Sequence, residues 1–157
     1  VCGLHKVLLD SARLLHEPAP EEISHAAQRL TELLRREDGA ILAFDSLFCS
    51  QTGFAGDDVA ARKVGKSLAA KLGEVLERTD HTLYDGLILV GGDTAVAVCR
   101  SLHTTQLLLL EEVQSGTPAG LLADGPFRGI PVVTKSGAFG DEDTLLHAWK
   151  YIRREGE

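Results

Sequence analysis

Short apolar runs alternate with amphipathic stretches along this chain, and that alternation limits the folds open to it. Ala40–Phe44 and Gly86–Val90 are brief apolar runs of the kind that form buried strands. Between them, a longer stretch repeats apolar residues every three or four positions, which is typical of a helix packed on one face. This pattern predicts an α/β protein: a layered sheet with helices on both faces, in a single domain spanning residues 1–157.

The amphipathic stretches predict four helices besides one that follows Gly86–Val90 and runs through Leu102. The first is expected over residues 4–17, the second between Pro20 and Gly39, the third from Asp57 or Asp58, and the fourth near the end. Their inward positions are expected to be Leu4, Val7, Leu8, Ala12 and Leu15; Ile23, Ala26, Ala27, Leu30, Leu33 and Leu34; Val64, Leu68, Leu72, Val75 and Leu76; and Leu145, Leu146, Trp149 and Ile152. Further strands are expected in "QLLLLEEV" and in "PAGLLADGPFRGIPVVT".

Composition narrows the classes of function. The chain has 157 residues, 44% of them hydrophobic, and a net charge of -7, which disfavours nucleic-acid binding. No apolar run approaches the length of a membrane span, and three scattered cysteines are too few for a disulfide framework, so we expect a cytoplasmic protein. The chain begins with Val1 and contains no Met, which favours a piece of a larger protein or a sequence from which modified methionines have been dropped.

The stretch "VGGDT" lies at the junction between a predicted central strand and a helix. Gly91 and Gly92 allow the backbone to approach a ligand closely, and the helix start offers free N–H groups to an anion. Thr94 adds a hydroxyl donor. Asp93 would repel a phosphate, so it is either the helix N-cap or a ligand of a metal that bridges phosphates. The alternative for the whole stretch is an ordinary strand–turn–helix connection.

A second stretch, "TKSGAFGDED", repeats this arrangement after another predicted strand. Lys135 is a positive charge suited to phosphate, Ser136 can donate a hydrogen bond, and Gly137 and Gly140 free the backbone. Asp141 or Asp143 is expected to cap the final helix. The alternative is a lysine that extends to solvent at a strand end. Because ligands of open α/β sheets lie at the carboxyl ends of strands, the two stretches together predict a phosphate site.

Other patterns in the chain do not support a site. "KVGKS" lacks the earlier glycine of a P-loop, since Ala60 stands there, and it lies within a helix. No G-x-G-x-x-G follows a strand, which counts against a dinucleotide-dependent enzyme. The histidines do not cluster, and His147 is expected on a helix face. No Ser-His-Asp or Cys-His grouping is readable, so the catalytic residue is unassigned.

The strand-GGDT-helix unit and the later "KSGAFGDEDTL", with "EEVQSGTPAGLL" between them, resemble the C-terminal nucleotide-binding domain of the four-carbon acid sugar kinases, which act on 3-oxo-tetronate, D-threonate and D-erythronate. The resemblance is strongest from Gly86 to Leu146. It implies contacts from Gly91–Thr94 and from Gly137 to ATP. A third family contact is a serine after a Val-x-Gly strand end, where this chain has Leu4.

The resemblance also implies a two-domain kinase that transfers the γ-phosphoryl group of ATP to a hydroxyl of the acid sugar. The acid sugar would bind an N-terminal domain that is absent from this sequence, whereas this domain would hold ATP and Mg²⁺. The fragment alone is therefore expected to be inactive, and a homo-oligomer is possible. The alternative is a stand-alone nucleotide- or anion-binding regulatory module without catalysis.

Overall fold

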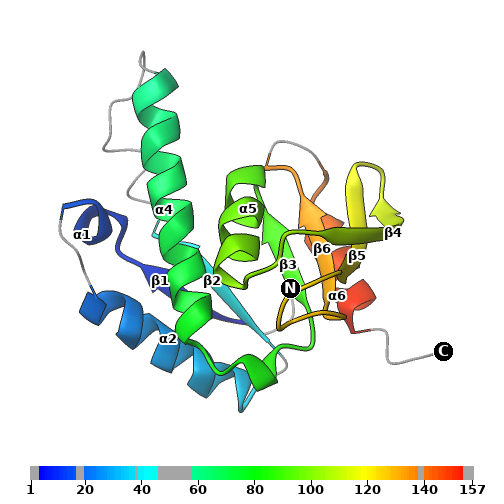
Figure 1. Ribbon diagram of the computed structural model, residues 1–157, viewed down its shortest axis with the longest axis horizontal. Coiled ribbons are helices and arrows are strands. Elements are labelled where there is room, and N and C mark those ends of the chain that lie inside the picture. The colour runs from blue at the N-terminus through cyan, green and yellow to red at the C-terminus, as the bar shows by residue number, and fades with distance from the viewer. Residues whose placement is uncertain (1–3, 17–19, 38, 46–57, 138–139, 154–157) are drawn as a thin grey trace. The chain divides into compact units, whose positions relative to one another are not determined.

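The computed structural model describes residues 4–16, 20–37, 39–45, 58–137 and 140–153 (Figure 1). The chain divides into two compact units, residues 1–83 and 84–157, each of which contains both helices and strands. The α/β class is therefore confirmed, with the strands in two sheets. Among the described residues, no helix combines the length and the apolar character needed to cross a membrane.

The first unit contains a two-stranded parallel sheet. Its elements are β1 (His5–Leu9), α1 (Ser11–His16), α2 (Pro20–Leu34), β2 (Ala40–Phe44), α4 (Asp58–Arg78) and a 3-10 turn at His81–Leu83. Helix α2 contacts both strands and also α4. As predicted, α2 buries Ile23, Ala26, Ala27 and Leu30. The strand predicted at Ala40–Phe44 is also confirmed, and α4 begins at Asp58, one of the two positions where the sequence placed its start. Asp57, the other position, lies outside the described residues.

The helix expected over residues 4–17 is wrong in its first half. Val7 and Leu9 are buried while Leu8 between them is 52% exposed, which is the two-residue period of a strand. Parallel pairing with β2, with Val7 opposite Leu42, overrides the helical spacing. Leu4 lies directly before β1, and Cys2 and Gly3, which would belong to a preceding strand end, lie outside the described residues.

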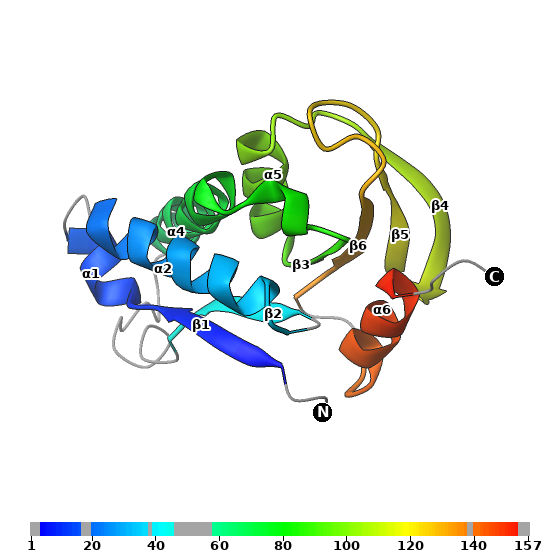
Figure 2. The same cartoon turned by 90° about the horizontal axis from the view of Figure 1, so that it is seen from below.

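The second unit contains a four-stranded sheet in the order β3-β6-β5-β4. Its elements are β3 (Leu87–Val90), α5 (Gly92–Ser101), β4 (Leu107–Gln114), β5 (Thr117–Leu122), β6 (Pro131–Lys135) and α6 (Thr144–Ile152). Strand β6 is parallel to β3 and antiparallel to β5, and β5 is antiparallel to β4. Figure 2 shows α5 and α6 on opposite faces of this sheet, so the prediction of helices on both faces is confirmed here.

Alternate residues of the sheet face the two helices. Ala119 and Val133 form a buried cluster with Ala148 of α6, and Ile88 packs against it. On the other face, Val132 lies opposite Leu87 in the β3–β6 pairing, and both are buried. The prediction that Leu145 of α6 points inward is wrong: Leu145 is 50% exposed, and the buried positions of α6 are Thr144 and Ala148.

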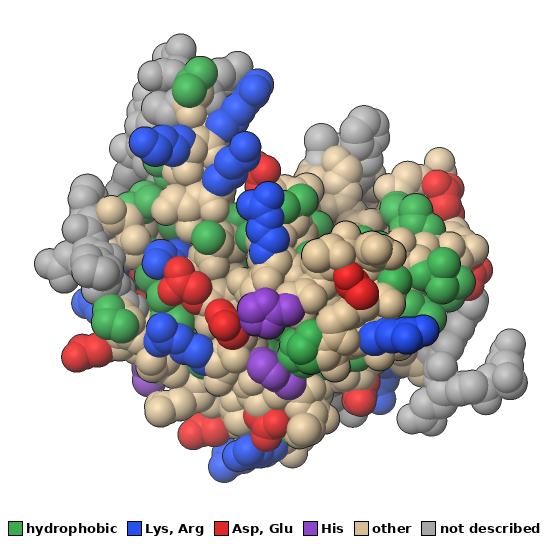
Figure 3. All heavy atoms as spheres, viewed as in Figure 1, with side chains coloured by type: hydrophobic (Ala, Val, Ile, Leu, Met, Phe, Trp, Pro, Cys, Tyr) green, Lys and Arg blue, Asp and Glu red, His purple; other side chains and the backbone are tan. Residues whose placement is uncertain are grey.

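Strand β4 forms one edge of this sheet and carries an apolar surface. Leu108, Leu109 and Leu110 are each more than half exposed. Hydrophobic side chains are visible where β4 runs along the right of the face drawn in Figure 3. The pairing with β5 is close, because a Cβ on Gly120 would overlap the carbonyl group of Leu108.

Candidate functional site

The structure brings the two predicted loops together. Strands β3 and β6 are parallel neighbours, with Val90 opposite Lys135, so the loops that follow them leave the same end of the sheet. Beyond the last pair, the backbone N–H of Gly91 donates to the carbonyl oxygen of Lys135 over 2.8 Å. The first residue of one loop is thereby fixed to the last strand residue before the other.

The first loop turns directly into α5. Gly91 occupies the N-cap position with φ of 96°, a conformation that favours glycine, and α5 begins at Gly92. A Cβ on Gly92 would meet no atom within 4 Å, so the backbone there is open to an approaching group. At Gly92 the helix start thus has no side chain of its own to obstruct an anion that approaches its N–H group.

The sequence left two roles open for Asp93, and the structure tests one of them, the capping role. The N-cap is Gly91, with no side-chain cap hydrogen bond, so a capping role for Asp93 is wrong. Asp93 lies in the first turn of α5, next to Thr94, with its side chain exposed. Among the described residues, no group of three or more His, Cys, Asp or Glu could hold a metal ion. Magnesium bound to nucleotide phosphates needs only one or two protein carboxylates, so Asp93 as its ligand stays a prediction.

The second loop carries Lys135 at its start. Lys135 is half-buried, and its ammonium group donates to the carbonyl oxygen of Ser136 over 2.8 Å. The positive charge therefore lies at the loop itself. Ser136 and Gly137 are exposed, and a Cβ on Gly137 would meet nothing within 4 Å. This part of the loop, like Gly92, leaves its backbone open.

Gly140 has a structural reason to be glycine. Its φ is 101°, and a Cβ on it would lie 2.6 Å from the hydroxyl oxygen of Thr144 and 3.2 Å from Cε of Lys135. The fold therefore needs glycine at this position whether or not a ligand binds there. A contact between Gly140 and nucleotide stays a prediction.

Asp141 organises the start of α6. Its Oδ1 accepts from the N–H of Asp143 and from the hydroxyl of Thr144, each over 3.0 Å, and its own N–H donates back to that hydroxyl over 2.9 Å. Its Oδ2 accepts from Nε2 of Gln114 over 2.7 Å. Asp143 stands at the N-cap position without a side-chain cap bond, so of the two predicted caps Asp141 is the one that satisfies donors here.

These donors stabilise the ionised carboxylate. The bond from Gln114, followed by that from Thr144, lowers the pKa of Asp141 below its ordinary value. Sequence reasoning missed Gln114. Its side chain reaches Asp141 only because β4 ends beside α6, and no local pattern signals that neighbourhood.

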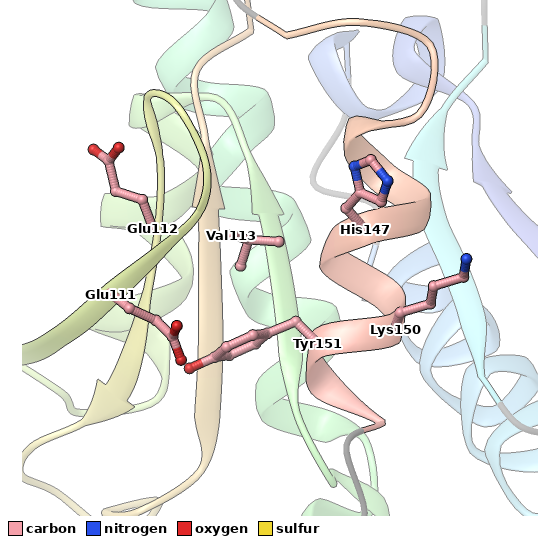
Figure 4. Close-up of a pocket in the computed structure, with 6 residues that line it drawn as sticks. All are labelled: Glu111, Glu112, Val113, His147, Lys150 and Tyr151. Atoms are coloured by element: carbon pink, nitrogen blue, oxygen red, sulfur yellow. The ribbon is translucent and has the colours of Figure 1, made fainter.

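A shallow hollow of about 290 Å³ lies elsewhere, on the α6 face of the second unit. Figure 4 shows its lining from β4 and α6, with the side chains of Glu111 and Tyr151 extending toward one another. His147, a helix-face residue as predicted, also lines it. None of its lining residues belongs to the two loops. Acidic side chains on one wall oppose phosphate binding, so the loops are the better candidate site.

Comparison with known proteins places this geometry in a family. Residues 3–145 match the model of the nucleotide-binding C-terminal domain. A D-threonate kinase from Bordetella bronchiseptica is 42% identical over 89 residues, which are 55% of this chain and 22% of that protein. A D-threonate kinase from Salmonella typhimurium is 29% identical over 155 residues, 92% of this chain and 35% of that protein. This chain therefore spans about a third or less of the length of these relatives.

A solved structure is similar to this chain in fold. A domain of unknown function from Bordetella bronchiseptica, crystallised with citrate as a domain-swapped dimer, has a TM-score of 0.72 and 28% identity, covering 96% of this chain and 35% of that one. The match of the family model extends over nearly the whole chain and includes the Gly91 loop and the Lys135 loop. This chain thus belongs to the family of nucleotide-binding C-terminal domains, and its relatives are D-threonate and D-erythronate kinases.

Proposed function

We propose that this domain binds Mg-ATP in a kinase that transfers the γ-phosphoryl group to a hydroxyl of a four-carbon acid sugar. The observation that carries the proposal is the hydrogen bond from Gly91 N–H to the Lys135 carbonyl oxygen, since it fixes two open-backbone loops side by side. The names of the relatives support a kinase rather than a stand-alone binding module without catalysis.

Each loop has a role in this proposal. Gly91 makes the turn into α5, and the N–H groups at the start of that helix, from Gly92 to Thr94, face the phosphates. Lys135 supplies positive charge, and the open backbone at residues 136–137 closes on the other side. Phosphoryl transfer depends mainly on positioning and on neutralising charge, which is what such loops provide. Gly140, at the end of the second loop, is also proposed to contact the nucleotide.

Asp93 is the proposed magnesium ligand. Its exposed carboxylate lies in the turn that would receive the phosphates. A magnesium ion held by Asp93 would neutralise charge on the phosphates. A carboxylate that is repulsive alone becomes favourable once the cation lies between it and the phosphates.

The acid sugar and the catalytic base belong, in this proposal, to an N-terminal domain of a longer protein. Support comes from the relatives, of which this chain spans 22% to 35%. We also propose that the protein is located in the cytoplasm, where ATP is available, and that it forms a homo-oligomer. The related domain-swapped dimer and the exposed leucines of the edge strand β4 support association.

The test is a radiolabelled ATP assay of the longer protein against D-threonate, D-erythronate and 3-oxo-tetronates. Transfer of label to one of these acids, dependent on Mg²⁺, is expected. If none accepts label while ATP still binds to this domain, the non-catalytic module becomes the better account. Light scattering on the same sample measures the oligomeric state.

A further inference from the structure

Gln114 is the last residue of β4, immediately before the tight Ser115–Gly116 turn into β5, and it pairs with Thr117 across the strands. Its side chain leaves the hairpin and donates from Nε2 to Oδ2 of Asp141 over 2.7 Å. The side-chain oxygen of Gln114 is buried and accepts no hydrogen bond from the part of the chain that the structure describes. The side-chain amide of Gln114 therefore bonds to Asp141 through its NH₂ group.

Asp141 transmits this contact to the loop that follows β6. Its other oxygen accepts from Asp143 and Thr144, so the carboxylate joins the hairpin tip to the first turn of α6. Thr144 is fully buried and fixed in two directions, since its hydroxyl also accepts from the N–H of Asp141. The residue before this network in the chain is Gly140.

Gly140 in turn lies against the lysine of the loop. A Cβ there would lie 3.2 Å from Cε of Lys135, so the lysine side chain passes beside the Gly140 backbone. The contacts therefore form a sequence from Gln114 through Asp141 and Gly140 to Lys135. A shift of Asp141 moves the backbone that flanks the lysine.

We propose that Gln114 and Asp141 are positioning residues that hold the second loop, and Lys135 with it, in the arrangement that receives nucleotide phosphate. The inference rests on the proposed function for its ligand, Mg-ATP. It adds that the β4–β5 hairpin, which contributes no phosphate contact, determines how well the loop binds. Neither residue need touch the nucleotide.

The test reverses the direction of the hydrogen bond. Gln114→Glu places a second carboxylate against Asp141 and should weaken Mg-ATP binding by about tenfold, the size of a charge-assisted hydrogen bond. Adding Asp141→Asn restores the pair, because the new amide can donate to the new carboxylate while its own oxygen still serves Asp143 and Thr144. The double variant has the wild-type net charge and should bind within about twofold of wild type. Gln114→Ala, which adds no charge, should weaken binding several-fold.

The measurements are made on the longer protein that contains this chain, at a temperature where every variant is folded. Calorimetry gives the Mg-ATP affinity. Amide hydrogen exchange of residues 135–144 without nucleotide reports the loop, and it should rise in Gln114→Glu and return in the double variant. Ser115→Glu is the matched control: it adds the same charge at the exposed neighbouring position and should leave both readouts near wild type.

Three other outcomes overturn the inference, and a fourth overturns the proposed function on which it rests. If the double variant binds as weakly as Gln114→Glu, the hydrogen bond between positions 114 and 141 does not position the loop. If Ser115→Glu weakens binding as much as Gln114→Glu does, the effect is electrostatic repulsion rather than positioning. If exchange rises and returns while affinity stays constant, Gln114 supports only the fold. If wild-type protein binds no Mg-ATP, the proposed function fails instead, and exchange alone then decides whether Gln114 and Asp141 hold the loop.

Discussion

The four glycines of the two loops differ in what an added methyl group would meet. Gly91 and Gly140 have φ of 96° and 101°, so the backbone itself requires glycine there. Gly92 and Gly137 have no such constraint, and a Cβ on either would meet nothing within 4 Å. A glycine that the fold does not need is a better indicator of a ligand than one that it does.

Gly92→Ala should therefore separate binding from folding. Alanine should leave the free energy of unfolding unchanged or raise it by up to about 1 kcal/mol, because glycine is the poorer helix residue. ATP affinity should fall by about tenfold or more, since the methyl group stands where phosphate approaches. Gly65→Ala in α4, whose Cβ also meets nothing, is the control for stability without binding loss. Unchanged ATP affinity in folded Gly92→Ala would remove the phosphates from this turn.

Lys135→Ala tests whether the lysine contacts phosphate or only extends to solvent. Loss of a charge-assisted contact should cost at least about tenfold in ATP affinity. The melting temperature should change little, because the ammonium group donates to the carbonyl of the adjacent Ser136 rather than to a distant element. Lys150→Ala, an exposed lysine of α6, controls for the change in net charge. A large loss of stability with normal binding would assign Lys135 to the fold.

Asp93→Asn tests the proposed magnesium ligand. The substitution should weaken Mg-ATP more than metal-free ATP, because the bridging cation loses a carboxylate while repulsion of the bare phosphates is relieved. Calorimetry with and without EDTA measures both affinities. Asp85→Asn, at another exposed position of the same unit, should affect neither. Equal weakening of the two forms would leave Asp93 without a metal role.

At the scale of elements, aspartates fix the connections between helices and strands. Asp124, after β5, accepts from the N–H groups of Thr105 and Gln106 at 2.8 and 3.2 Å and from the Thr105 hydroxyl. It thereby holds the turn between α5 and β4. The hydrogen bond from the Thr105 side chain is the largest of the effects that lower the pKa of Asp124 below 3.8.

This lowered pKa predicts a pH dependence of stability. The unfolded chain binds a proton at Asp124 more readily than the folded chain, so stability from this group is complete well above pH 3.8 and is lost as the pH falls through the lower folded pKa. Urea unfolding of wild type and Asp124→Asn should thus give different free energies of unfolding at neutral pH, and the difference should shrink as the pH falls below about 4. The other aspartates with lowered pKa are common to both proteins and cancel. A difference that does not shrink on acidification would contradict this.

The sequence predicted well whether a segment forms a helix or a strand wherever a single spacing of apolar residues dominated. The apolar run before Gly91 and the amphipathic pattern of α2 each fit a single kind of element, and both predictions are confirmed. Residues 4–17 failed because Leu4, Val7 and Leu8 satisfy a helical spacing, whereas parallel pairing with β2 decides the outcome. Such long-range pairing is invisible in a local pattern.

Within the candidate site, the sequence predicted the loops but not their connections. That both loops leave neighbouring parallel strands follows from sheet order, which no residue pattern specifies. The capping role of Asp93 was wrong because Gly91 already makes the turn. Gln114 was missed for the same reason as the sheet order: its partner Asp141 is 27 positions away in the sequence.

At the scale of the whole molecule, both loops belong to the second compact unit, residues 84–157. The family model nevertheless matches residues 3–145, which belong to both units. The domain that the family model describes is therefore larger than the unit that carries the loops. The D-threonate kinase from Salmonella typhimurium is longer still, since the match covers 35% of its length.

The isolated chain should bind ATP but phosphorylate no acid sugar. It has the two candidate loops, whereas its arginines lie mainly on helices and the site for the sugar carboxylate is proposed to lie in the N-terminal domain. The measurement is the radiolabelled assay on this chain beside the longer protein, with ATP binding confirmed on the same sample. Turnover by the chain at a rate near that of the longer protein would show that the substrate site lies within residues 1–157.

The hydrogen bond between Gly91 and Lys135 has a consequence for the order of events in folding. It joins strands that are separated in the chain by α5 and by the whole β4–β5 hairpin. Hairpins form quickly from local contacts, whereas parallel pairing of distant strands must wait for a long loop to close. The two candidate loops are therefore expected to come together late, and the appearance of ATP binding during refolding would time the closure of β3 on β6.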